Sequence, residues 1–320
     1  MSEFIGTKLT MNLGERSYDI IVKSGSLENL YQFARLDRRV AVVTDSGVPA
    51  QYAQMVADQC KDAHIITVPQ GEASKSFKIL ESVLRQMLEF GMGRGDLVIA
   101  VGGGVVGDLA GFAASIYMRG IDFINCPTTT LSMIDSSIGG KTAVDLGDTK
   151  NIVGAFWQPK LVIVDPDTLA TLPRRHFING LAEAVKASLL ADPELFAIFE
   201  NGDVDAQIGE IICRSLRFKK NIVEQDETEQ GMRKALNFGH TIGHGIEAVK
   251  GIKGRRTVGL FHGECVALGM LPMIESKALQ KRVRAVYRRL GLPLRTTYNK
   301  EKVLAEMLHD KKAQGGQITI

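Results

Sequence analysis

The glycine-rich segment Gly102–Asp108 directly follows the apolar run Leu97–Val101, and this junction constrains the fold more than any other stretch. Its glycines match the spacing GxGxxG, and the apolar residues that come next predict a helix over 109–117. At a strand-to-helix turn of this kind, backbone N–H groups at the helix N-terminus can bind a pyrophosphate. GxGxxG turns also occur without ligands, but the position between a strand and a helix favours a nucleotide site here.

The rest of the first half alternates between strand and helix patterns. Short β-branched runs predict strands at 39–44, 64–68, 123–126 and 161–164. Apolar residues at helical spacing predict helices at 48–60 and 79–90. Such alternation is typical of a parallel sheet with helices on its faces. Asp122 is too close to the glycine turn to bind a ribose, so Asp45, which ends an earlier strand, is the better candidate.

The second half follows a helical pattern. After Pro173, apolar residues recur at helical spacing over 177–190, 193–199, 204–223, 235–249, 263–279, 283–290 and 301–309. Few strand patterns interrupt these segments, which is typical of an all-helical unit. We therefore predict an α/β nucleotide-binding domain with a parallel sheet over residues 1–165, followed by an all-α domain over residues 166–320.

Composition limits the classes of function. The chain has 320 residues, 45% of them hydrophobic and 23% charged, which suits a globular protein of two domains. A formal net charge of +3 is too small for a nucleic-acid-binding surface, although acidic small molecules remain candidate ligands. The four cysteines lack CxxC spacing, and we expect neither a membrane-spanning run nor a signal sequence. These features predict a cytoplasmic protein with reduced thiols and with no nucleic-acid or membrane partner.

Three of the six histidines lie between Leu236 and Cys265. His240 and His244 are four residues apart, which places both imidazoles on one face of a helix, and His262 opens a second apolar run. Two imidazoles on facing helices, joined by a carboxylate from elsewhere, would form the open three-ligand site of a catalytic zinc ion. The alternative is that each histidine is a hydrogen-bonded structural residue.

Several charged residues also allow two interpretations. Glu183 and Lys186 lie three apart on an otherwise apolar helix, which fits a partly exposed ion pair or a carboxylate ligand beside an ammonium. Lys219 and Arg233 flank an acidic stretch and, taken alone, are typical of a solvated surface. Lys141 follows two glycines and suits a phosphate or carboxylate, although the segment lacks the first glycine of an ATPase P-loop.

Six motifs occur in one order along the chain: GGGVVGD, PTTT, DSSIGGKT, GLAEAVK, LNFGHTIGH and HGECVALGM. In this order they resemble the 3-dehydroquinate synthases of the sugar phosphate cyclase superfamily, and the resemblance runs from Asp45 to Lys312. It implies a nucleotide-binding α/β domain and a helical domain, with the active site between them. It also implies bound NAD and one Zn²⁺ or Co²⁺ ion.

The resemblance assigns ligands residue by residue. The implied metal ligands are Glu183, His240 and His262, which makes His244 an acid–base group beside the metal. The implied NAD contacts are Asp45, Gly71, Glu72, Lys75, Gly103, Gly104, Val105, Val106, Gly107, Asp108, Thr128, Thr129, Lys141 and Lys150. The implied substrate contacts are Asp135, Lys141, Asn151, Lys186, Lys219, Arg233, Asn237, His244, Lys311 and Lys312. Of these, His244, Lys186, Lys141, Asn151 and Asn237 are the implied catalytic residues.

The implied substrate is the phosphorylated sugar acid 3-deoxy-D-arabino-heptulosonate 7-phosphate (DAHP) of the shikimate pathway. The reaction yields 3-dehydroquinate and phosphate by oxidation, phosphate elimination, reduction, ring opening and aldol closure. Two anionic groups call for two cationic pockets. Lys141, Asn151, Asn237 and His244 suit the phosphate, together with Arg119 contributed across a homodimer interface. The residues that suit the carboxylate are Arg233, Lys219 and one of Lys311 or Lys312.

Three other functions stay open. A cyclase acting on sedoheptulose or glucose phosphate would not need the carboxylate-binding cations Arg233 and Lys219. A metal-dependent polyol dehydrogenase would release NADH at every cycle, and a non-catalytic nucleotide-binding protein would bind both cofactors without reaction. Three segments depart from the expected pattern, and the first of them, 144–149, lacks the glycine expected just before Lys150. The basic loop 250–256 is longer than the resemblance implies, and the alternating run 317–320 predicts the beginning of a strand.

Overall fold

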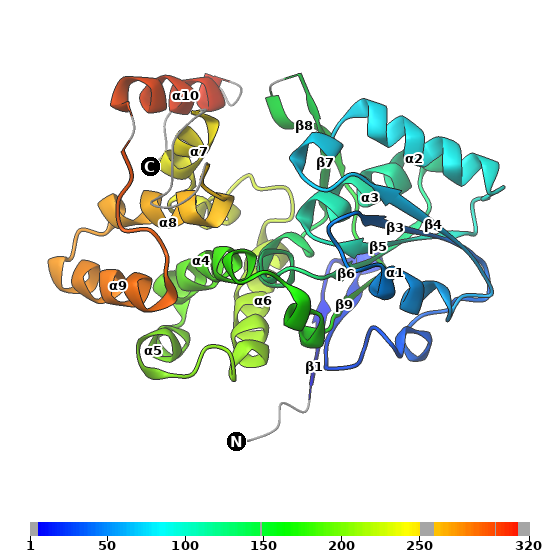
Figure 1. Cartoon of the computed structure of the whole chain (residues 1–320), viewed down its shortest axis with the longest axis horizontal. Coiled ribbons are helices and arrows are strands. Elements are labelled where there is room, and N and C mark those ends of the chain that lie inside the picture. The colour runs from blue at the N-terminus through cyan, green and yellow to red at the C-terminus, as the bar shows by residue number, and fades with distance from the viewer. Residues whose placement is uncertain (1–5, 148, 250–258, 298, 313–320) are drawn as a thin grey trace.

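The computed structural model of this protein describes residues 6–147, 149–249, 259–297 and 299–312, with side chains as far as Met307. The basic loop 250–256 and the strand predicted to begin at 317–320 lie outside the described residues. Figure 1 shows the sheet with its helices on the right and the helix-only part of the chain on the left. The predicted fold class, a parallel-dominated α/β part followed by a helical part, is confirmed.

Seven strands form the main sheet, in the order β1-β2-β9-β6-β5-β3-β4. The predicted strands are present as β3 (Arg39–Asp45), β4 (Asp62–Val68), β5 (Leu97–Gly102), β6 (Asp122–Pro127) and β9 (Leu161–Val164), and all of them pair in parallel. The sequence prediction did not include β1 (Thr7–Met11) and β2 (Tyr18–Val22). β2 extends the parallel sheet beside β9, and β1 pairs with β2 in antiparallel fashion.

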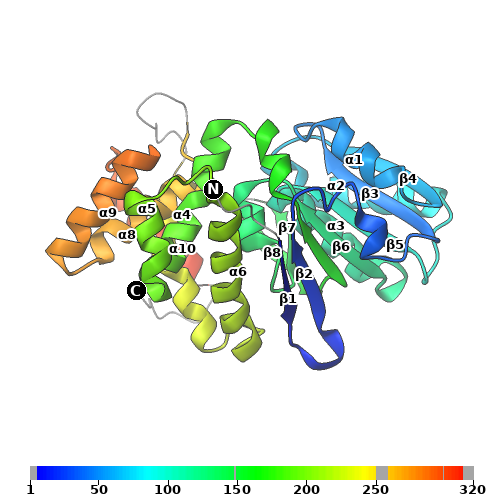
Figure 2. The same ribbon diagram turned by 90° about the horizontal axis from the view of Figure 1, so that it is seen from below.

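Helices cover both faces of this sheet (Figure 2). α1 (Ala50–Ala57) packs on one face through Tyr52 and Val56. α2 (Phe77–Glu89) and α3 (Gly104–Ile116) cover the other face. α3 begins inside the glycine turn, five residues before the predicted start. The reason is that the first turn of the helix includes the glycines themselves, and the apolar pattern begins only after them.

The polar segment between β6 and β9 contains structure that the sequence prediction left as loops. A short π-helix, η5 (Ser132–Ser136), is followed by an antiparallel hairpin of β7 (Lys141–Leu146) and β8 (Thr149–Phe156). Most side chains of β8 are exposed or half-exposed, so the strand has no apolar alternation to reveal it. The 3-10 turns are η1 (Gly14–Arg16), η2 (Leu30–Gln32), η3 (Glu72–Ser74), η4 (Tyr117–Arg119), η6 (Pro166–Thr171) and η7 (Met232–Asn237).

After β9 the described chain is helical. The helices are α4 (Arg174–Ala191), α5 (Pro193–Asn201), α6 (Ile208–Gln225), α7 (His240–Ala248), α8 (His262–Met273), α9 (Lys277–Leu290) and α10 (Lys300–Lys312). The single helix predicted over 263–279 is wrong, because the segment is divided between α8 and α9. The Ser276 hydroxyl accepts a hydrogen bond from Leu279 N at 3.3 Å and caps the new helix.

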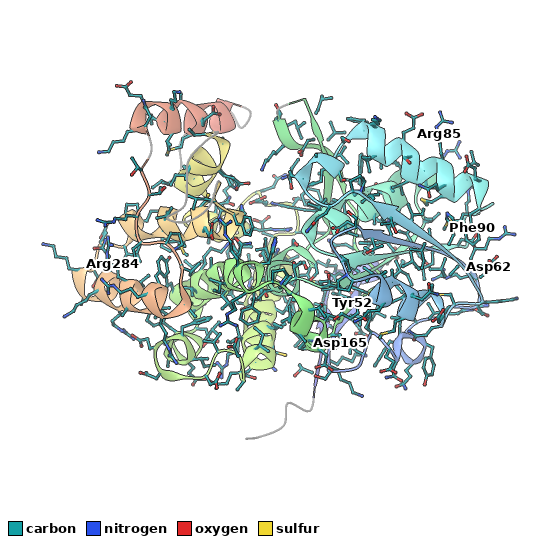
Figure 3. All side chains as sticks on the ribbon, viewed as in Figure 1. Tyr52, Asp62, Arg85, Phe90, Asp165 and Arg284 are labelled. Atoms are coloured by element: carbon teal, nitrogen blue, oxygen red, sulfur yellow. The ribbon has the colours of Figure 1, made fainter. Side chains whose placement is uncertain are left out.

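One hydrophobic core joins the sheet to the helices. Met11, Tyr18 and Ile20 of the β1–β2 edge belong to the same buried cluster as Leu181 and Val185 of α4. Asp165, at the end of β9, lies where the two parts meet (Figure 3). The division into domains at residue 165 stays a prediction, since apolar packing continues across it.

Candidate active site

The predicted cofactor residues gather at one edge of the sheet. Because neighbouring strands are parallel, the carboxyl ends of β3, β4, β5 and β6 meet there. Asp45 ends β3, and its Oδ1 accepts hydrogen bonds from Gly47 N at 2.8 Å and Val48 N at 3.2 Å. Gly103 lies against Thr129, because a Cβ on this glycine would sit 3.1 Å from the threonine methyl group. The same edge receives the remaining predicted residues Gly71, Glu72, Gly104, Val105, Val106, Gly107, Asp108 and Thr128.

Lys75 joins the glycine turn to the β7–β8 hairpin. Its side chain is buried, and its ammonium forms an ion pair with Asp108 Oδ2 at 2.6 Å. The same ammonium donates a short hydrogen bond to Asn151 Oδ1. Burial raises the pKa of Asp108, and the charge of Lys75 opposes this effect. A predicted cofactor residue and a predicted substrate residue therefore share one cation.

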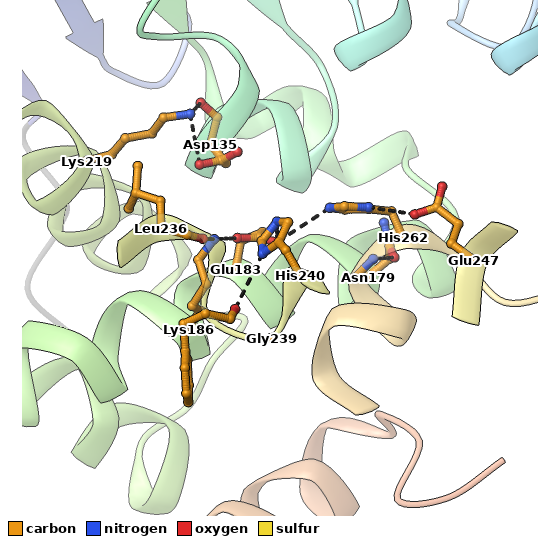
Figure 4. Close-up of polar contacts among 12 residues, drawn as sticks. Asp135, Asn179, Glu183, Lys186, Lys219, Leu236, Gly239, His240, Glu247 and His262 are labelled. Carbon is orange, nitrogen blue, oxygen red and sulfur yellow. Dashed lines mark hydrogen bonds and ion pairs between the residues drawn. The ribbon is translucent and has the colours of Figure 1, made fainter. Parts of the chain in front are cut away.

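Three helices bring the proposed metal ligands together (Figure 4). Glu183 of α4 is 2% exposed, and its Oε1 lies 3.5 Å from His240 Nε2 and 3.7 Å from His262 Nε2. His244 stands beside them, since one nitrogen from each of the three imidazoles lies within 4.8 Å of the others. The expected convergence of a glutamate and two histidines, distant in sequence, is confirmed.

This arrangement fits a divalent cation. Both oxygens of Glu183 are buried and accept no hydrogen bond from any described residue, although Oε2 forms a short ion pair with Lys186. Two oxygen or nitrogen ligands about 2.1 Å from a tetrahedral ion lie about 3.4 Å apart, which is close to the separations observed here. A carboxylate and two imidazoles are also the donor set that zinc prefers. These residues therefore fit a divalent cation, and their assignment as metal ligands stays a prediction.

The electrostatics favour an ionised Glu183 and a neutral His240, whereas His262 must lose a proton before it can bind a metal. Burial alone would raise the pKa of Glu183, but Lys186 and the two histidines hold it well below its ordinary range. Burial and the charge of Lys186 lower the pKa of His240 to about 3, so its imidazole is neutral. Burial opposes protonation of His262, yet Glu183 and Glu247 raise its pKa to about 10. Carboxylates therefore surround this imidazole with negative charge, which a metal ion would balance.

The interpretation of Glu183 and Lys186 as a partly exposed ion pair is wrong. Lys186 is 3% exposed, and its ammonium also donates a hydrogen bond to Leu236 O at 2.7 Å. A buried pair of this kind is costly to desolvate and contributes little to stability by itself. Its position beside two imidazoles favours the role of ligand and supporting cation.

The first turn of α8 is fixed to α4. The N–H of Gly263 donates a hydrogen bond to Asn179 Oδ1 at 2.7 Å, and the N–H of Phe261 donates one to Glu264 Oε2 at 2.8 Å. Arg175 of α4 forms an ion pair with the same Glu264 at 2.7 Å. These contacts place His262 opposite Glu183.

α7 and α8 approach closely because glycines face each other. A Cβ on Gly269 would lie 2.1 Å from Gly239 O and 2.9 Å from Gly243 N. We expect Gly269→Ala to separate the helices, to lower the free energy of unfolding by about 1–3 kcal/mol and to weaken Co²⁺ binding. Urea unfolding and cobalt titration measure these two effects. The matched control is Gly95→Ala, in a turn where an added Cβ would meet no described atom within 4 Å beyond its chain neighbours. Equal stability and equal cobalt affinity of the two variants would contradict the prediction.

Two predicted carboxylate-binding cations are buried, so their interpretation as a solvated surface is wrong. Lys219 is 8% exposed, and its ammonium contacts Asp135 Oδ1 at 2.9 Å and Asp135 O at 2.8 Å. Arg233 is 2% exposed and donates hydrogen bonds to Gly139 O, at 3.2 Å, and to the carbonyl of Glu227. Burial lowers the pKa of Lys219, and Asp135 opposes that shift.

Two predicted phosphate-binding residues meet at one carboxylate. Lys141 forms a short ion pair with Glu229, and Asn237 Nδ2 donates a hydrogen bond to the same carboxylate at 3.2 Å. Asn151, assigned to the same phosphate, contacts Lys75 instead. Arg119 is exposed on the turn η4, and its side chain has no hydrogen bond or ion pair with another described residue. Lys311 and Lys312 are in α10, but their side chains lie outside the described part of the chain.

Sequence reasoning missed two acidic residues of the site, Glu229 and Glu247. Glu229 meets the side chains of Lys141 and Asn237. Glu247 contacts His262 and Lys150. A signal for Glu247 was present, because it follows His240 and His244 at the spacing i, i+4, i+7 and so lies on the same helix face. Glu229 sits in an acidic stretch with no such periodicity.

Comparison with known proteins decides the family. The model of the N-terminal part of 3-dehydroquinate synthase matches residues 65–179, and that of the C-terminal part matches residues 180–313. The 3-dehydroquinate synthase of Pelobacter propionicus is 41% identical over 332 residues, which cover 97% of this chain and 91% of that protein. The chain belongs to the 3-dehydroquinate synthase family. The 3-dehydroquinate synthase of Caulobacter vibrioides is 42% identical over 97% of this chain and 90% of its own length.

Solved structures of related cyclases share this fold. A 2-deoxy-scyllo-inosose synthase, complexed with carbaglucose-6-phosphate, NAD⁺ and Co²⁺, has a TM-score of 0.85 and 25% identity. It matches 95% of this chain and 87% of its own. The 2-epi-5-epi-valiolone synthase of Streptomyces hygroscopicus, solved with NAD⁺ and Zn²⁺, has a TM-score of 0.83 and 29% identity over 95% of this chain and 89% of its own. A probable glycerol dehydrogenase from Sinorhizobium meliloti is 19% identical with a TM-score of 0.58, which shows a shared fold alone.

Within the described residues, none of the helices is both long and apolar enough to cross a membrane.

Proposed function

We propose that this chain converts DAHP into 3-dehydroquinate and phosphate, as an NAD- and divalent-metal-dependent carbon–oxygen lyase of the shikimate pathway. The observation that carries the proposal is the convergence of Glu183, His240 and His262 in a chain of the 3-dehydroquinate synthase family. Relatives about 40% identical over nearly the whole chain are 3-dehydroquinate synthases, whereas the cyclases with other products are 25–29% identical.

We assign the two cofactors to the two parts of the site. NAD is held at the edge of the sheet by the predicted residues from Asp45 to Lys150. Zn²⁺ or Co²⁺ is held by Glu183, His240 and His262, because both metals accept this donor set. The chemistry supplied by bound NAD is hydride transfer, and that supplied by the metal is polarisation of substrate hydroxyls.

The protein's own side chains orient the substrate. Lys141 and Asn237 already hold one anion, the carboxylate of Glu229, which supports their assignment to the substrate phosphate. Asn151, whose side-chain oxygen accepts a hydrogen bond from Lys75, is the third residue that we assign to the phosphate. Holding the phosphate and the carboxylate at separate points fixes the ring between them, and such orientation lowers the entropic part of the barrier.

Other residues bind the substrate carboxylate and transfer the hydroxyl proton. Lys219 and Arg233 are buried cations, and burial lowers the pKa of both although nearby carboxylates such as Asp135 oppose the shift, so a substrate carboxylate would further offset their desolvation. We assign one of Lys311 or Lys312 to the same carboxylate and Asp135 to a substrate hydroxyl. His244 relays the hydroxyl proton through water, and Lys186 holds the carboxylate of Glu183 in place.

We further propose a homodimer in which Arg119 binds the phosphate in the neighbouring subunit. Its exposure on η4 supports this assignment, because the guanidinium is accessible to a neighbouring subunit. We expect Arg119→Ala and Glu183→Gln to be inactive separately and to regain about a quarter of wild-type activity when mixed and allowed to exchange subunits. A phosphate-release assay of the mixture measures this recovery. No recovery, in a mixture shown by mass spectrometry to contain heterodimers, would contradict the shared site.

The function is tested by incubating the purified protein with DAHP, catalytic NAD⁺ and Zn²⁺. We expect phosphate release matched by an equal amount of 3-dehydroquinate. Turnover of sedoheptulose 7-phosphate or glucose 6-phosphate, but not of DAHP, would assign the chain to another cyclase. Stoichiometric NADH in solution would indicate a dehydrogenase, and no reaction with both cofactors bound would indicate a binding protein.

A further inference from the structure

A continuous polar connection begins at the proposed metal ligand His262 and runs through Glu247 to Lys150. His262 Nδ1 of α8 lies 2.9 Å from Glu247 Oε2 of α7, as Figure 4 shows. The other oxygen of Glu247 contacts the ammonium of Lys150 in β8 at 2.7 Å.

The geometry around His262 separates its two nitrogens. Nε2 faces Glu183 Oε1 at 3.7 Å, and Nδ1 faces Glu247. An imidazole that binds a metal through Nε2 must carry its proton on Nδ1, so a carboxylate at Nδ1 fixes both the tautomer and the ring orientation. His240 has a weaker partner at the same position, because its Nδ1 is 3.4 Å from the carbonyl of Phe238.

We propose that Glu247 is a positioning residue that holds His262 in its metal-binding orientation, an inference that rests on the proposed function. Glu247 accepts the Nδ1 proton of His262 and thereby directs Nε2 toward Glu183. Lys150 places a positive charge on the far side of the same carboxylate. Because Lys150 is also a predicted NAD contact on the hairpin, the connection joins the metal-ligand helices to the cofactor side of the site.

A simple surface ion pair does not account for this arrangement. The side chain of Lys150 is 50% exposed, and exposed lysine–glutamate pairs contribute little to stability. The more enclosed contact of Glu247 is the one with the imidazole. An interaction that matters mainly for orienting a ligand should therefore affect metal affinity more than the stability of the metal-free protein.

The test compares Co²⁺ binding by metal-free wild type, Glu247→Gln and Glu247→Ala, followed by the visible absorption of the bound ion. We expect the cobalt dissociation constant to rise about 10–100-fold in Glu247→Gln, and further in Glu247→Ala. The absorption band should shift as the geometry of the site relaxes. The matched control is Glu200→Gln, because Glu200 is also a helical glutamate in an ion pair, with 22% exposure against 21% for Glu247.

Urea unfolding of each metal-free variant separates positioning from folding. We expect Glu247→Gln and Glu200→Gln to unfold at similar midpoints, while only the former loses cobalt affinity. Wild-type cobalt affinity and an unshifted band in Glu247→Gln would overturn the positioning role and leave the proposed function intact. If the wild type binds no Co²⁺, both the proposed metal site and the positioning role fail.

Discussion

Replacing Glu183 by glutamine is expected to lower kcat/KM with DAHP by at least about 1,000-fold, because the site loses its only charged metal ligand among the three proposed. Glu183 is buried and faces both His240 and His262, so the substitution removes the negative charge between the two imidazoles. Cobalt titration should show the same loss before any substrate is added. A Glu183→Gln variant with wild-type cobalt affinity and turnover would exclude Glu183 as a ligand.

The same substitution leaves the Lys186 ammonium buried without its partner. Breaking a buried pair in this way is expected to cost about 3–5 kcal/mol of unfolding free energy. The double variant Glu183→Gln, Lys186→Met removes that charge and should recover most of the stability, as urea unfolding would show. It should recover neither metal binding nor activity. This comparison separates the loss of a ligand from the loss of the fold.

Replacing Arg233 by lysine is expected to raise the KM for DAHP about 100-fold and to leave NAD affinity within about twofold. Arg233 is buried, and a guanidinium binds a carboxylate through two parallel hydrogen bonds that an ammonium cannot reproduce. Its hydrogen bonds to the carbonyls of Gly139 and Glu227 hold it at a fixed place between the sheet part and the helices. Steady-state kinetics measure the first quantity and fluorescence titration of NAD measures the second.

The control for this change is Arg214→Lys. Arg214 lies in the helical part, forms ion pairs with Asp192, Glu194 and Glu210, and is 26% exposed. Its substitution should alter stability without a selective effect on DAHP. Equal losses of DAHP and NAD binding in Arg233→Lys would argue against a carboxylate pocket and would favour a cyclase whose substrate lacks that group.

The sequence predicts a strand most clearly where burial on both faces determines its residue types. Strands β3, β5 and β9 are buried on both faces, so they appear as unbroken β-branched runs. β8 is largely exposed and its side chains follow no apolar period, so it was not predicted. The division of 263–279 into two helices depended on the Ser276 cap, a single residue within an otherwise helical pattern.

The site could be predicted in part for a similar reason. Histidines are rare in this chain, so their spacing identified α7 and α8 as candidate ligand helices. Glu183 was chosen through the resemblance, and only the folded structure shows it between two imidazoles. Glu229, the partner of Lys141, lies 88 residues away in an acidic stretch without periodicity, so no pattern in the chain identified it. Glu247, the partner of His262, shares a helix face with His240 and His244, a signal that the sequence prediction did not use.

The apolar face that β1 and β2 share with α4 has a consequence for synthesis on the ribosome. The sheet residues Met11, Tyr18 and Ile20 emerge first, while their packing partners in the helices follow more than 100 residues later. Until then this face is uncovered and open to self-association or to chaperones. A fragment ending near β9 would keep that exposure permanently, so we expect it to aggregate when expressed alone.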